Sequence, residues 1–283
     1  MKKLSLTIGL LTCAWIAIGQ NLYYNKGIPY GKNNKAGDHV KVNGIRMYYE
    51  IYGEGKPLVL LHGNGGSIAG FANVIPKLSQ SFKVVAIDSR CHGQSGCSKD
   101  LNYEMMASDV NALLDKLGID SAYMWGHSDG GIVGLIMGYQ YPVKVKRLVT
   151  SGANVLPDET ALEPVIVDLM KNYTAIPDTM MQKRIRLMVE HPHIDFAQLG
   201  KINAPVMIVS GDRDAVLLEH SIRIFRSIPN SNLCILPAST HFVNTEKPNL
   251  MLFWLNEFFT KKFTKPSTVD WAIKVAEEMG LKK

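Results

Sequence analysis

The amino-acid sequence predicts an α/β fold in which a mostly parallel sheet is flanked by helices. Three observations predict it: short continuous apolar runs recur along the chain, segments with helical spacing separate most of them, and an alternating hairpin pattern comes first. The apolar runs are residues 58–61, 84–87, 122–125, 148–151, 206–210 and 233–236. Runs of this kind are typical of parallel strands, because both faces of such a sheet are buried.

The composition fits one enzyme-sized globular domain or two small ones. The chain has 283 residues, of which 46% are hydrophobic and 20% charged, and these fractions exclude a disordered or collagen-like protein. The formal net charge is +6, but no cluster of five or more basic residues occurs. We therefore expect a mixed, solvated surface and no nucleic-acid partner.

The first residues have the pattern of a secretory signal peptide. Lys2 and Lys3 precede the uncharged stretch Leu4–Ile18, and the small residues Ala17 and Gly19 stand where a signal peptidase prefers them. We expect residues 1–19 to be removed on export, which leaves a periplasmic or secreted protein without stable membrane insertion.

Two alternatives for this segment stay open. An uncleaved anchor is disfavoured because Leu4–Ile18 is shorter than the ~20 apolar residues that span a bilayer. Leu10–Cys13 faintly resembles a lipoprotein box, but Thr12 directly before the cysteine is unfavourable and apolar residues continue beyond it. Export without a lipid anchor is therefore the favoured expectation.

The remaining cysteines are Cys91, Cys97 and Cys234. In an oxidising compartment Cys91 and Cys97 are close enough in sequence to form a disulfide, and two separate thiols are the alternative, since loop geometry decides between them. No CxxC pair or other metal-ligand spacing occurs, so we expect no metal site.

The first and last elements of the predicted fold have simple signals. Residues 40–52 alternate in polarity around Asn43-Gly44, a dipeptide that favours a tight turn, and therefore predict a hairpin. At the other end, residues 267–281 follow Pro266 and predict an added amphipathic helix.

Residues 156–200 interrupt the alternation of strands and helices. They contain four prolines and no convincing strand, whereas residues 161–171 and 178–190 have helical spacing. We expect a helical cap over the strand ends, inserted into a core made of residues 20–155 and 201–283.

The clearest local motif is Gly126-His127-Ser128-Asp129-Gly130-Gly131. It follows the strand 122–125 and precedes a helical run at 132–139. A serine at such a junction has strained backbone geometry, and glycines on both sides let the strand and the helix approach each other. The motif predicts Ser128 as an exposed nucleophile at the N-terminus of a helix.

A serine hydroxyl becomes a good nucleophile only beside a base that a carboxylate orients. In Gly211-Asp212-Arg213-Asp214 the acids follow the strand 206–210, and His241 follows the strand 233–236. Each candidate lies just past a strand end, at the same edge of the sheet as Ser128. The order Ser128, Asp214, His241 therefore predicts a catalytic triad.

The same chemistry needs two N–H donors that face one oxygen atom, an oxyanion hole. One donor is expected from Asp129, directly after the nucleophile. The glycine-rich turn His62-Gly63-Asn64-Gly65-Gly66 follows the strand 58–61, and Asn64 is the expected second donor. A phosphate-binding loop is the alternative for this turn, but it lacks both G-x-G-x-x-G and a P-loop lysine.

On these motifs the chain resembles α/β-hydrolase-fold proteins of the capped serine esterase type. The match covers Val40–Phe263 and includes the His62-Gly63 turn, Asp88–Ser95, the Ser128 junction, Asp214 and His241. The resemblance implies an eight-stranded, mostly parallel sheet with a small helical cap. It also assigns the acid of the triad to Asp214 instead of Asp212.

The resemblance has consequences for other residues in these motifs. Cys91 stands where the family usually has glycine, which strengthens the disulfide interpretation. His62 and His92 recur in the family as residues that support the fold. We expect His127 to point to the other side of the turn from the nucleophile and to be structural.

A serine at the junction favours acyl transfer to water, so we expect a carboxylesterase-like hydrolase that cleaves a small carboxylic ester through an acyl-enzyme. Neither a cofactor nor a metal is needed for this chemistry. Asn154 and Met170 are the expected substrate contacts, and the cap methionines Met170, Met180, Met181 and Met188 either face the substrate or fill the space between cap and core. The expected partner is a small-molecule ester, and the protein is expected to be a monomer or homodimer.

Alternatives of two classes stay open. Gly126–Ile132 together with Gly152-Ala153-Asn154 is similar to hydrolases of α-amino-acid esters, which need an acid to bind the ammonium group; Asp158, Glu159 or Glu163 would supply it, and an aminopeptidase-like hydrolase is a related possibility. Peptidase, lactonase, carbon–carbon hydrolase and perhydrolase activities share the triad. The other class is a ligand-binding member of the fold without catalysis.

Overall fold

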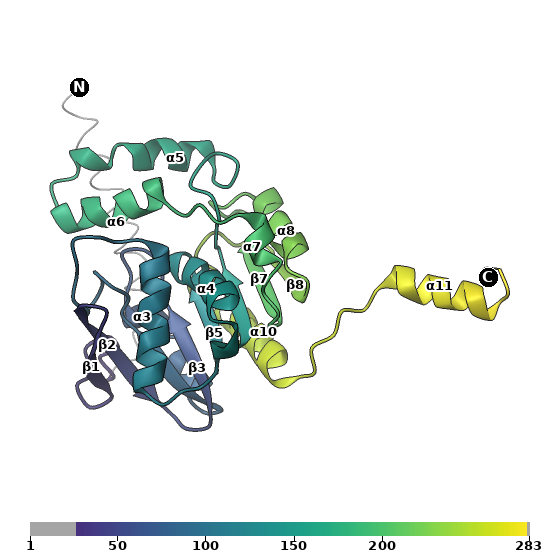
Figure 1. The fold of residues 1–283 in the computed structure, drawn as a ribbon, viewed down its shortest axis with the longest axis horizontal. Coiled ribbons are helices and arrows are strands. Elements are labelled where there is room, and N and C mark those ends of the chain that lie inside the picture. Colours follow the sequence, from purple (N-terminus) through teal and green to yellow (C-terminus); the bar gives the residue numbers. More distant parts are fainter. Residues whose placement is uncertain (1–26, 282–283) are drawn as a thin grey trace.

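The computed structural model describes residues 27–281 and contains one eight-stranded sheet. The predicted signal peptide, residues 1–19, lies outside the described residues. The strands are β1 (Gly37–Val42), β2 (Ile45–Tyr52), β3 (Lys56–Leu61), β4 (Phe82–Ile87), β5 (Ala122–His127), β6 (Val145–Ser151), β7 (Val206–Gly211) and β8 (Ser231–Leu236). Each predicted strand is present, and the sheet is the predicted α/β architecture (Figure 1).

The strand order is β1-β2-β4-β3-β5-β6-β7-β8. The strand β2 is antiparallel to both β1 and β4, and all pairs from β4 through β8 are parallel. Because β3 to β8 are parallel, their carboxyl ends lie at one edge of the sheet, where open α/β sheets bind ligands. The predicted hairpin is β1–β2, and its turn residues Asn43 and Gly44 have φ of 41° and 81°, as a tight hairpin turn requires.

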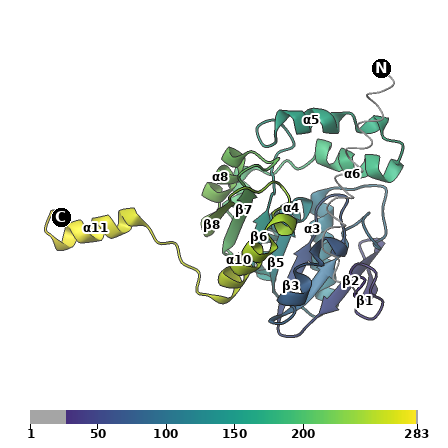
Figure 2. The same ribbon diagram turned by 180° about the vertical axis from the view of Figure 1, so that it is seen from behind.

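Helices cover both faces of the sheet (Figures 1 and 2). One face carries α3 (Tyr103–Lys116), α4 (Asp129–Gln140) and α8 (Leu218–Ser227); the other carries η1 (Ile68–Phe71), α2 (Ile75–Leu78), α9 (Val243–Glu246) and α10 (Pro248–Thr260). Successive strand residues point to opposite faces: Val59 and Leu61 join one buried cluster, Leu58 and Leu60 the other. This double burial explains why the strands are continuous apolar runs.

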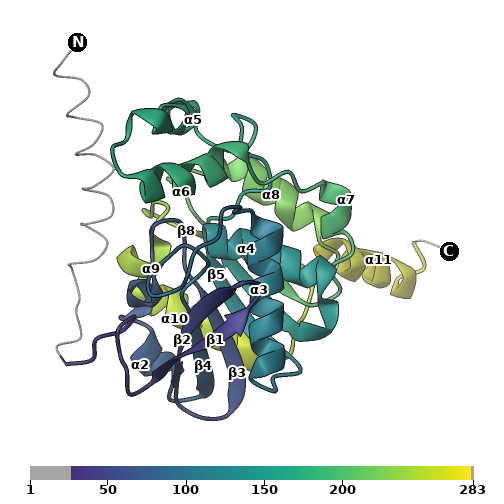
Figure 3. The same cartoon turned by 60° about the vertical axis from the view of Figure 1, so that its left-hand side comes forward.

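The segment between β6 and β7 forms α5 (Pro164–Lys171), η3 (Tyr173–Ala175), α6 (Thr179–Glu190) and α7 (Phe196–Leu199). Helices α5 and α6 lie beyond the carboxyl ends of the strands (Figures 1 and 3). Helix α5 begins at Pro164 instead of residue 161, because a proline is favoured in the first turn of a helix. Helix α6 begins after Asp178, whose carboxylate accepts a hydrogen bond from the N–H of Met181 at 2.8 Å.

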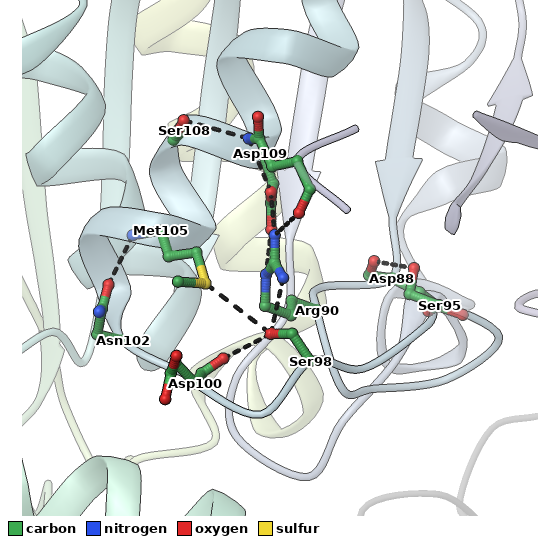
Figure 4. A network of polar contacts seen from close by, with 10 residues as sticks. Asp88, Arg90, Ser95, Ser98, Asp100, Asn102, Met105, Ser108 and Asp109 are labelled. Carbon is green, nitrogen blue, oxygen red and sulfur yellow. Dashed lines mark hydrogen bonds and ion pairs between the residues drawn. The ribbon is translucent and has the colours of Figure 1, made fainter. Parts of the chain in front are cut away.

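A buried ion pair fixes the loop that follows β4 (Figure 4). The Arg90 guanidinium donates to both carboxylate oxygens of Asp109 on α3, at 2.7 and 2.6 Å, and to the hydroxyl of Ser98 at 2.8 Å. The side chains of Arg90 and Asp109 are 1% and 0% exposed. In the same loop Cys91 and Cys97 form a disulfide, which decides between the two alternatives left by the sequence.

The predicted last helix is α11 (Thr268–Glu278), and it projects away from the rest of the chain (Figures 1 and 2). The remaining short helix, η2 (Pro142–Lys144), connects α4 to β6. Across residues 27–281, no helix is both long enough and apolar enough to cross a bilayer.

Candidate active site

Ser128 lies at the junction between β5 and α4, as the motif predicts. Its backbone has φ of 54°, a left-handed conformation that is rare for a residue with a side chain. The flanking glycines make this turn possible: a Cβ atom on Gly126 would overlap the carbonyl group of Gly130, and one on Gly130 would overlap that of Leu61. The packing of β3, β5 and α4 around the turn therefore requires both glycines.

The structure joins Ser128, His241 and Asp214 in one chain of hydrogen bonds. The Asp214 Oδ1 atom lies 2.7 Å from His241 Nδ1, and His241 Nε2 lies 3.0 Å from Ser128 Oγ. Asp214 follows β7 and His241 follows β8, so the parallel sheet brings together residues that are far apart in sequence. A Cβ on Gly152, after β6, would lie 2.8 Å from the His241 ring, so this glycine makes room for the imidazole.

The charges of these residues fix their hydrogen-bonding roles. Burial raises the pKa of Asp214, but the His241 ring and the N–H of Val216 outweigh it and leave the pKa below its ordinary value. Burial likewise lowers the pKa of His241, but Asp214, with Asp129 and Glu246, outweighs it and raises the pKa above 6.5. The ionised Asp214 accepts a hydrogen bond from the Nδ1–H group of His241. Nε2 of the neutral ring therefore carries no proton and can accept the proton of Ser128.

The two predicted oxyanion residues lie on either side of Ser128. Asp129 is the first residue of α4, and Asn64 lies in the turn after β3. That turn lies against the serine, since a Cβ on Gly63 would be 3.0 Å from the Cβ of Ser128. Within residues 27–281, the backbone N–H groups of Asn64 and Asp129 have no hydrogen-bond acceptor. Both donors are therefore available, and the N-terminus of α4 favours negative charge nearby.

A cavity of about 660 Å³ opens over Ser128, and residues of α5 and α6 line its far side. Both predicted substrate contacts, Asn154 and Met170, lie in its wall. Met181 and Met188 line it too, whereas Met180 lies beside Cys97, with 4.0 Å between the sulfur atoms. Apolar side chains dominate the wall, as is usual for sites that bind small organic molecules.

The expectation for His127 is wrong in one respect. Its ring lies beside the candidate site: its centroid is 5.1 Å from that of His241, and the residue lines the cavity. Burial, followed by the nearby His241, lowers the pKa of His127 to about 3, so this ring is neutral at physiological pH. His62 agrees with its expected role, since its Nε2 accepts the N–H of Ser89 at 3.0 Å and holds the neighbouring strand ends together.

The sequence reasoning missed Arg184 of α6, which lines the cavity. Its guanidinium donates to the carbonyl of Cys91 through Nε at 2.8 Å and Nη2 at 2.6 Å. Burial lowers its pKa, and Asp178 offsets part of this effect. A sequence signal exists: Met181, Ile185 and Met188 recur at helical spacing, and Arg184 lies on the same face of the helix.

The three cap acids considered as ammonium ligands do not line the main cavity. Asp158 and Glu159 border a separate, smaller cavity of about 390 Å³, together with Lys171. Glu163 lies at the start of α5, outside the wall of either cavity. The aminoacyl interpretation therefore has no acid from this group in the cavity over Ser128.

Comparisons with known proteins agree with this fold. A family model described as the alpha/beta hydrolase fold matches residues 56–189. The uncharacterised hydrolase YugF of Bacillus subtilis is 26% identical over 262 residues, covering 77% of this chain and 95% of the relative. The 2-hydroxy-6-oxononadienedioate/2-hydroxy-6-oxononatrienedioate hydrolase 1 of Pseudomonas putida is 26% identical over 269 residues. The match covers 76% of this chain and 92% of the relative.

A solved structure described as Est816, an N-acyl homoserine lactone degrading enzyme, superposes with a TM-score of 0.70. It is 23% identical and covers 78% of this chain and all of that chain, which is a likeness of fold. The sheet order, the family match and the relatives lead to one conclusion. The chain has the α/β-hydrolase fold, and the family match and the curated relatives support hydrolase activity.

Proposed function

We propose that this protein is a serine hydrolase that cleaves small carboxylic esters through an acyl-enzyme intermediate. The observation that carries the proposal is the hydrogen-bonded chain from Asp214 through His241 to Ser128, with distances of 2.7 and 3.0 Å. A carboxylate, an imidazole and a hydroxyl in this order are what nucleophilic catalysis by serine needs.

In the proposed mechanism, Ser128 Oγ attacks the ester carbonyl while His241 Nε2 takes its proton. The charge of Asp214 stabilises the imidazolium that forms, and the N–H groups of Asn64 and Asp129 bind the oxyanion. His241 then gives the proton to the leaving alcohol, and the acyl group stays on Ser128. A water molecule, deprotonated by His241, attacks the acyl-enzyme and releases the carboxylic acid.

The cavity supports a substrate with a mainly apolar body. Its volume of about 660 Å³ lies within the range for small-molecule sites. Leu162, Ile166 and Met170 contribute to the cap side of the wall, and Phe71 contributes from the core. Esters of short and medium acyl chains fit this lining better than strongly polar substrates, because burial of their CH₂ groups is favourable.

The test uses p-nitrophenyl acetate, butyrate and longer acyl esters with the wild-type protein and Ser128→Ala. Wild type should hydrolyse at least one ester, and a fluorophosphonate probe should label it. Ser128→Ala should lose the label and reduce kcat by roughly 10⁴-fold or more. Absence of both turnover and labelling in wild type would show that the proposed function is wrong and would favour a ligand-binding role.

A second candidate function is hydrolysis of a substrate that carries a carboxylate near the bond that is cleaved, including a carbon–carbon bond. Arg184 supports it, because its partly buried guanidinium lines the cavity and, in the described part of the chain, forms no ion pair with a carboxylate. The Pseudomonas putida relative is named for hydrolysis of dioates. A substrate carboxylate would supply the missing counter-charge.

Paired substrates separate the two candidates. An ester with a terminal carboxylate and its neutral methyl ester are compared in wild type and Arg184→Gln. If the second candidate holds, the charged substrate has the higher kcat/KM in wild type and Arg184→Gln removes that preference. If the neutral ester is preferred in both proteins, the simple esterase proposal stands.

We also propose that the protein is exported and cleaved after Gly19. The basic start and apolar stretch of residues 1–19 support this proposal. Fractionation of cells that express the full chain, with N-terminal sequencing of the product, tests it. Retention of the full chain in the cytoplasm would contradict it.

A further inference from the structure

The two residues proposed to bind the oxyanion are joined to each other by their side chains. Asn64 Nδ2 donates to Asp129 Oδ2 at 2.8 Å. The backbone N–H of each residue is the one proposed to face the substrate, so this bond connects the two halves of the oxyanion hole directly. Its effect depends on how firmly each half is held without it.

The two halves are held very differently. Asp129 is the first residue of α4, a regular helix whose backbone is fixed by its own hydrogen bonds. Asn64 lies in a turn flanked by Gly63, Gly65 and Gly66, where the N–H of Gly66 bonds to the carbonyl of Gly63 at 3.1 Å. Glycines at these positions leave the turn with wide backbone freedom. The Asn64 N–H thus needs an additional constraint to stay at a fixed distance from that of Asp129.

The Asp129 carboxylate is itself held in place. Its other oxygen, Oδ1, accepts the hydroxyl of Tyr103 on α3 at 2.9 Å, and the residue is 2% exposed. A buried carboxylate with both oxygens bonded has one favoured orientation, because rotation would leave a polar atom without a partner. Asp129 is therefore a rigid acceptor for Asn64.

The Asn64 amide also contacts the cap. Nδ2 donates at 3.0 Å to the backbone carbonyl of Arg184, in the middle of α6. The guanidinium of Arg184 bonds in turn to the carbonyl of Cys91 in the core. One amide group therefore ties the oxyanion turn both to the nucleophile helix and to the helix that covers the cavity.

We propose that the Asn64 side chain is a positioning residue that holds the two oxyanion N–H donors at their working separation and links that separation to the cap helix α6. The inference rests on the proposed function and adds to it a requirement for a specific side-chain pair. Any residue at position 64 other than proline would provide the backbone N–H. The test must therefore change the side chain of Asn64 and leave that N–H in place.

The experiment compares wild type, Asn64→Ala, Asn64→Asp, Asp129→Asn and the exchange Asn64→Asp with Asp129→Asn. For each we would measure kcat and KM for the best p-nitrophenyl ester, and the inhibition constant of a trifluoromethyl ketone that forms an oxyanion on Ser128. Asn64→Ala should lower kcat by roughly 10- to 100-fold with little change in KM, and weaken the ketone by a similar factor.

The exchange variant keeps the test decisive if Asn64→Ala is unstable. Asn64→Asp places two carboxylates together and should lower kcat more than Asn64→Ala does. In the exchange variant an amide at 129 can again donate to a carboxylate at 64, but that carboxylate cannot donate to the Arg184 carbonyl, so kcat should recover only in part, by at least tenfold over Asn64→Asp. If the fold loss of kcat in the exchange variant equals or exceeds the product of the fold losses in Asn64→Asp and Asp129→Asn, the two side chains act independently. That result would overturn the inference.

A matched control is Asn111→Ala, which removes a half-buried asparagine that bonds to Asp115 on α3, away from the cavity. It should leave kcat and the ketone inhibition constant within twofold of wild type. If wild type turns over and is labelled but Asn64→Ala matches it in kcat and ketone affinity, this inference alone is wrong. If wild type is neither active nor labelled, the proposed function is wrong and the inference with it.

Discussion

The His241 Nε2 atom lies 3.0 Å from the hydroxyl oxygen of Ser128, although 113 positions separate the two residues in the chain. The other ring nitrogen, Nδ1, donates to the Asp214 carboxylate at 2.7 Å. The carboxylate raises the pKa of His241 above 6.5 against the opposing effect of burial. This arrangement gives the proposed reaction a definite pH dependence.

The first prediction concerns that pH dependence. His241 must be neutral to take the Ser128 proton, and a raised pKa keeps it protonated to a higher pH. Activity should therefore fall as pH decreases, with a midpoint of kcat/KM above pH 6.5. In Asp214→Asn the midpoint should move to lower pH, and kcat should fall by roughly 10³- to 10⁴-fold because the ring loses its oriented tautomer.

Asp212→Asn is the control for this pH profile. Asp212 is the other acid of the same segment and accepts the N–H of Ser239, not the imidazole. Its substitution should leave the midpoint in place. An unchanged midpoint in Asp214→Asn would contradict the assignment of Asp214.

The second prediction concerns the buried pair of Arg90 and Asp109. Replacement of Asp109 by Ala leaves the Arg90 charge buried without its partner, since the two side chains are 1% and 0% exposed. The free energy of unfolding should fall by roughly 3–5 kcal/mol, measured by urea denaturation. Lys274→Ala, which breaks the exposed pair with Glu278, should leave the urea midpoint unchanged. Equal stability of Asp109→Ala and wild type would refute this account of the loop.

The third prediction compares a glycine of the Ser128 junction with a glycine that has open space around it. Gly130→Ala should prevent formation of the folded soluble protein, because its Cβ would overlap the Leu61 carbonyl in the backbone of β3. Gly70→Ala is the matched control: no atom lies within 4 Å of its Cβ position, so the melting temperature should stay within a few degrees. Circular dichroism of both variants tests this prediction. A stable, cooperatively folded Gly130→Ala would contradict the claim that the packing at position 130 excludes a Cβ atom.

The fourth prediction concerns the Cys91–Cys97 disulfide. Reduction, or the double substitution of both cysteines by Ser, should lower the free energy of unfolding by roughly 2 kcal/mol, because the closed loop no longer restricts the unfolded chain. Hydrogen exchange of α6 should become faster, since Arg184 of α6 bonds to the Cys91 carbonyl. In the control Cys234→Ser, reductant should lower the free energy of unfolding as much as in wild type. If reductant does not change the stability of wild type, the disulfide is contradicted.

Much of the fold and of the candidate site could be predicted from local sequence. Apolar runs located the strands, because strands buried on both faces tolerate few polar residues. The glycines around Ser128 located the junction, because only small residues fit where a strand and a helix approach so closely. The order of the motifs along the sequence then identified Asp214 and His241 as residues at strand ends. In the structure His241 is hydrogen-bonded to both Ser128 and Asp214.

Other features depended on contacts between distant segments. The disulfide needed the conformation of the loop, in which Cys91 has φ of 63°, the region usually reserved for glycine. The positions of the His127 ring and of Arg184 followed from how α6 and the His241 loop pack over Ser128. Periodicity shows which face of a helix is apolar, but it does not say which other segment that face meets.

The sequence by itself determined the parallel sheet, the serine junction and the order of the three candidate catalytic residues, because each is encoded by residues that are neighbours in the chain. Only the tertiary structure decided that Asn64 bonds to Asp129 and Arg184, and that α5 and α6 line an apolar cavity over Ser128. The physical reason is range: backbone propensity and burial patterns act over a few residues, whereas a hydrogen bond between side chains requires three-dimensional proximity that the whole fold sets.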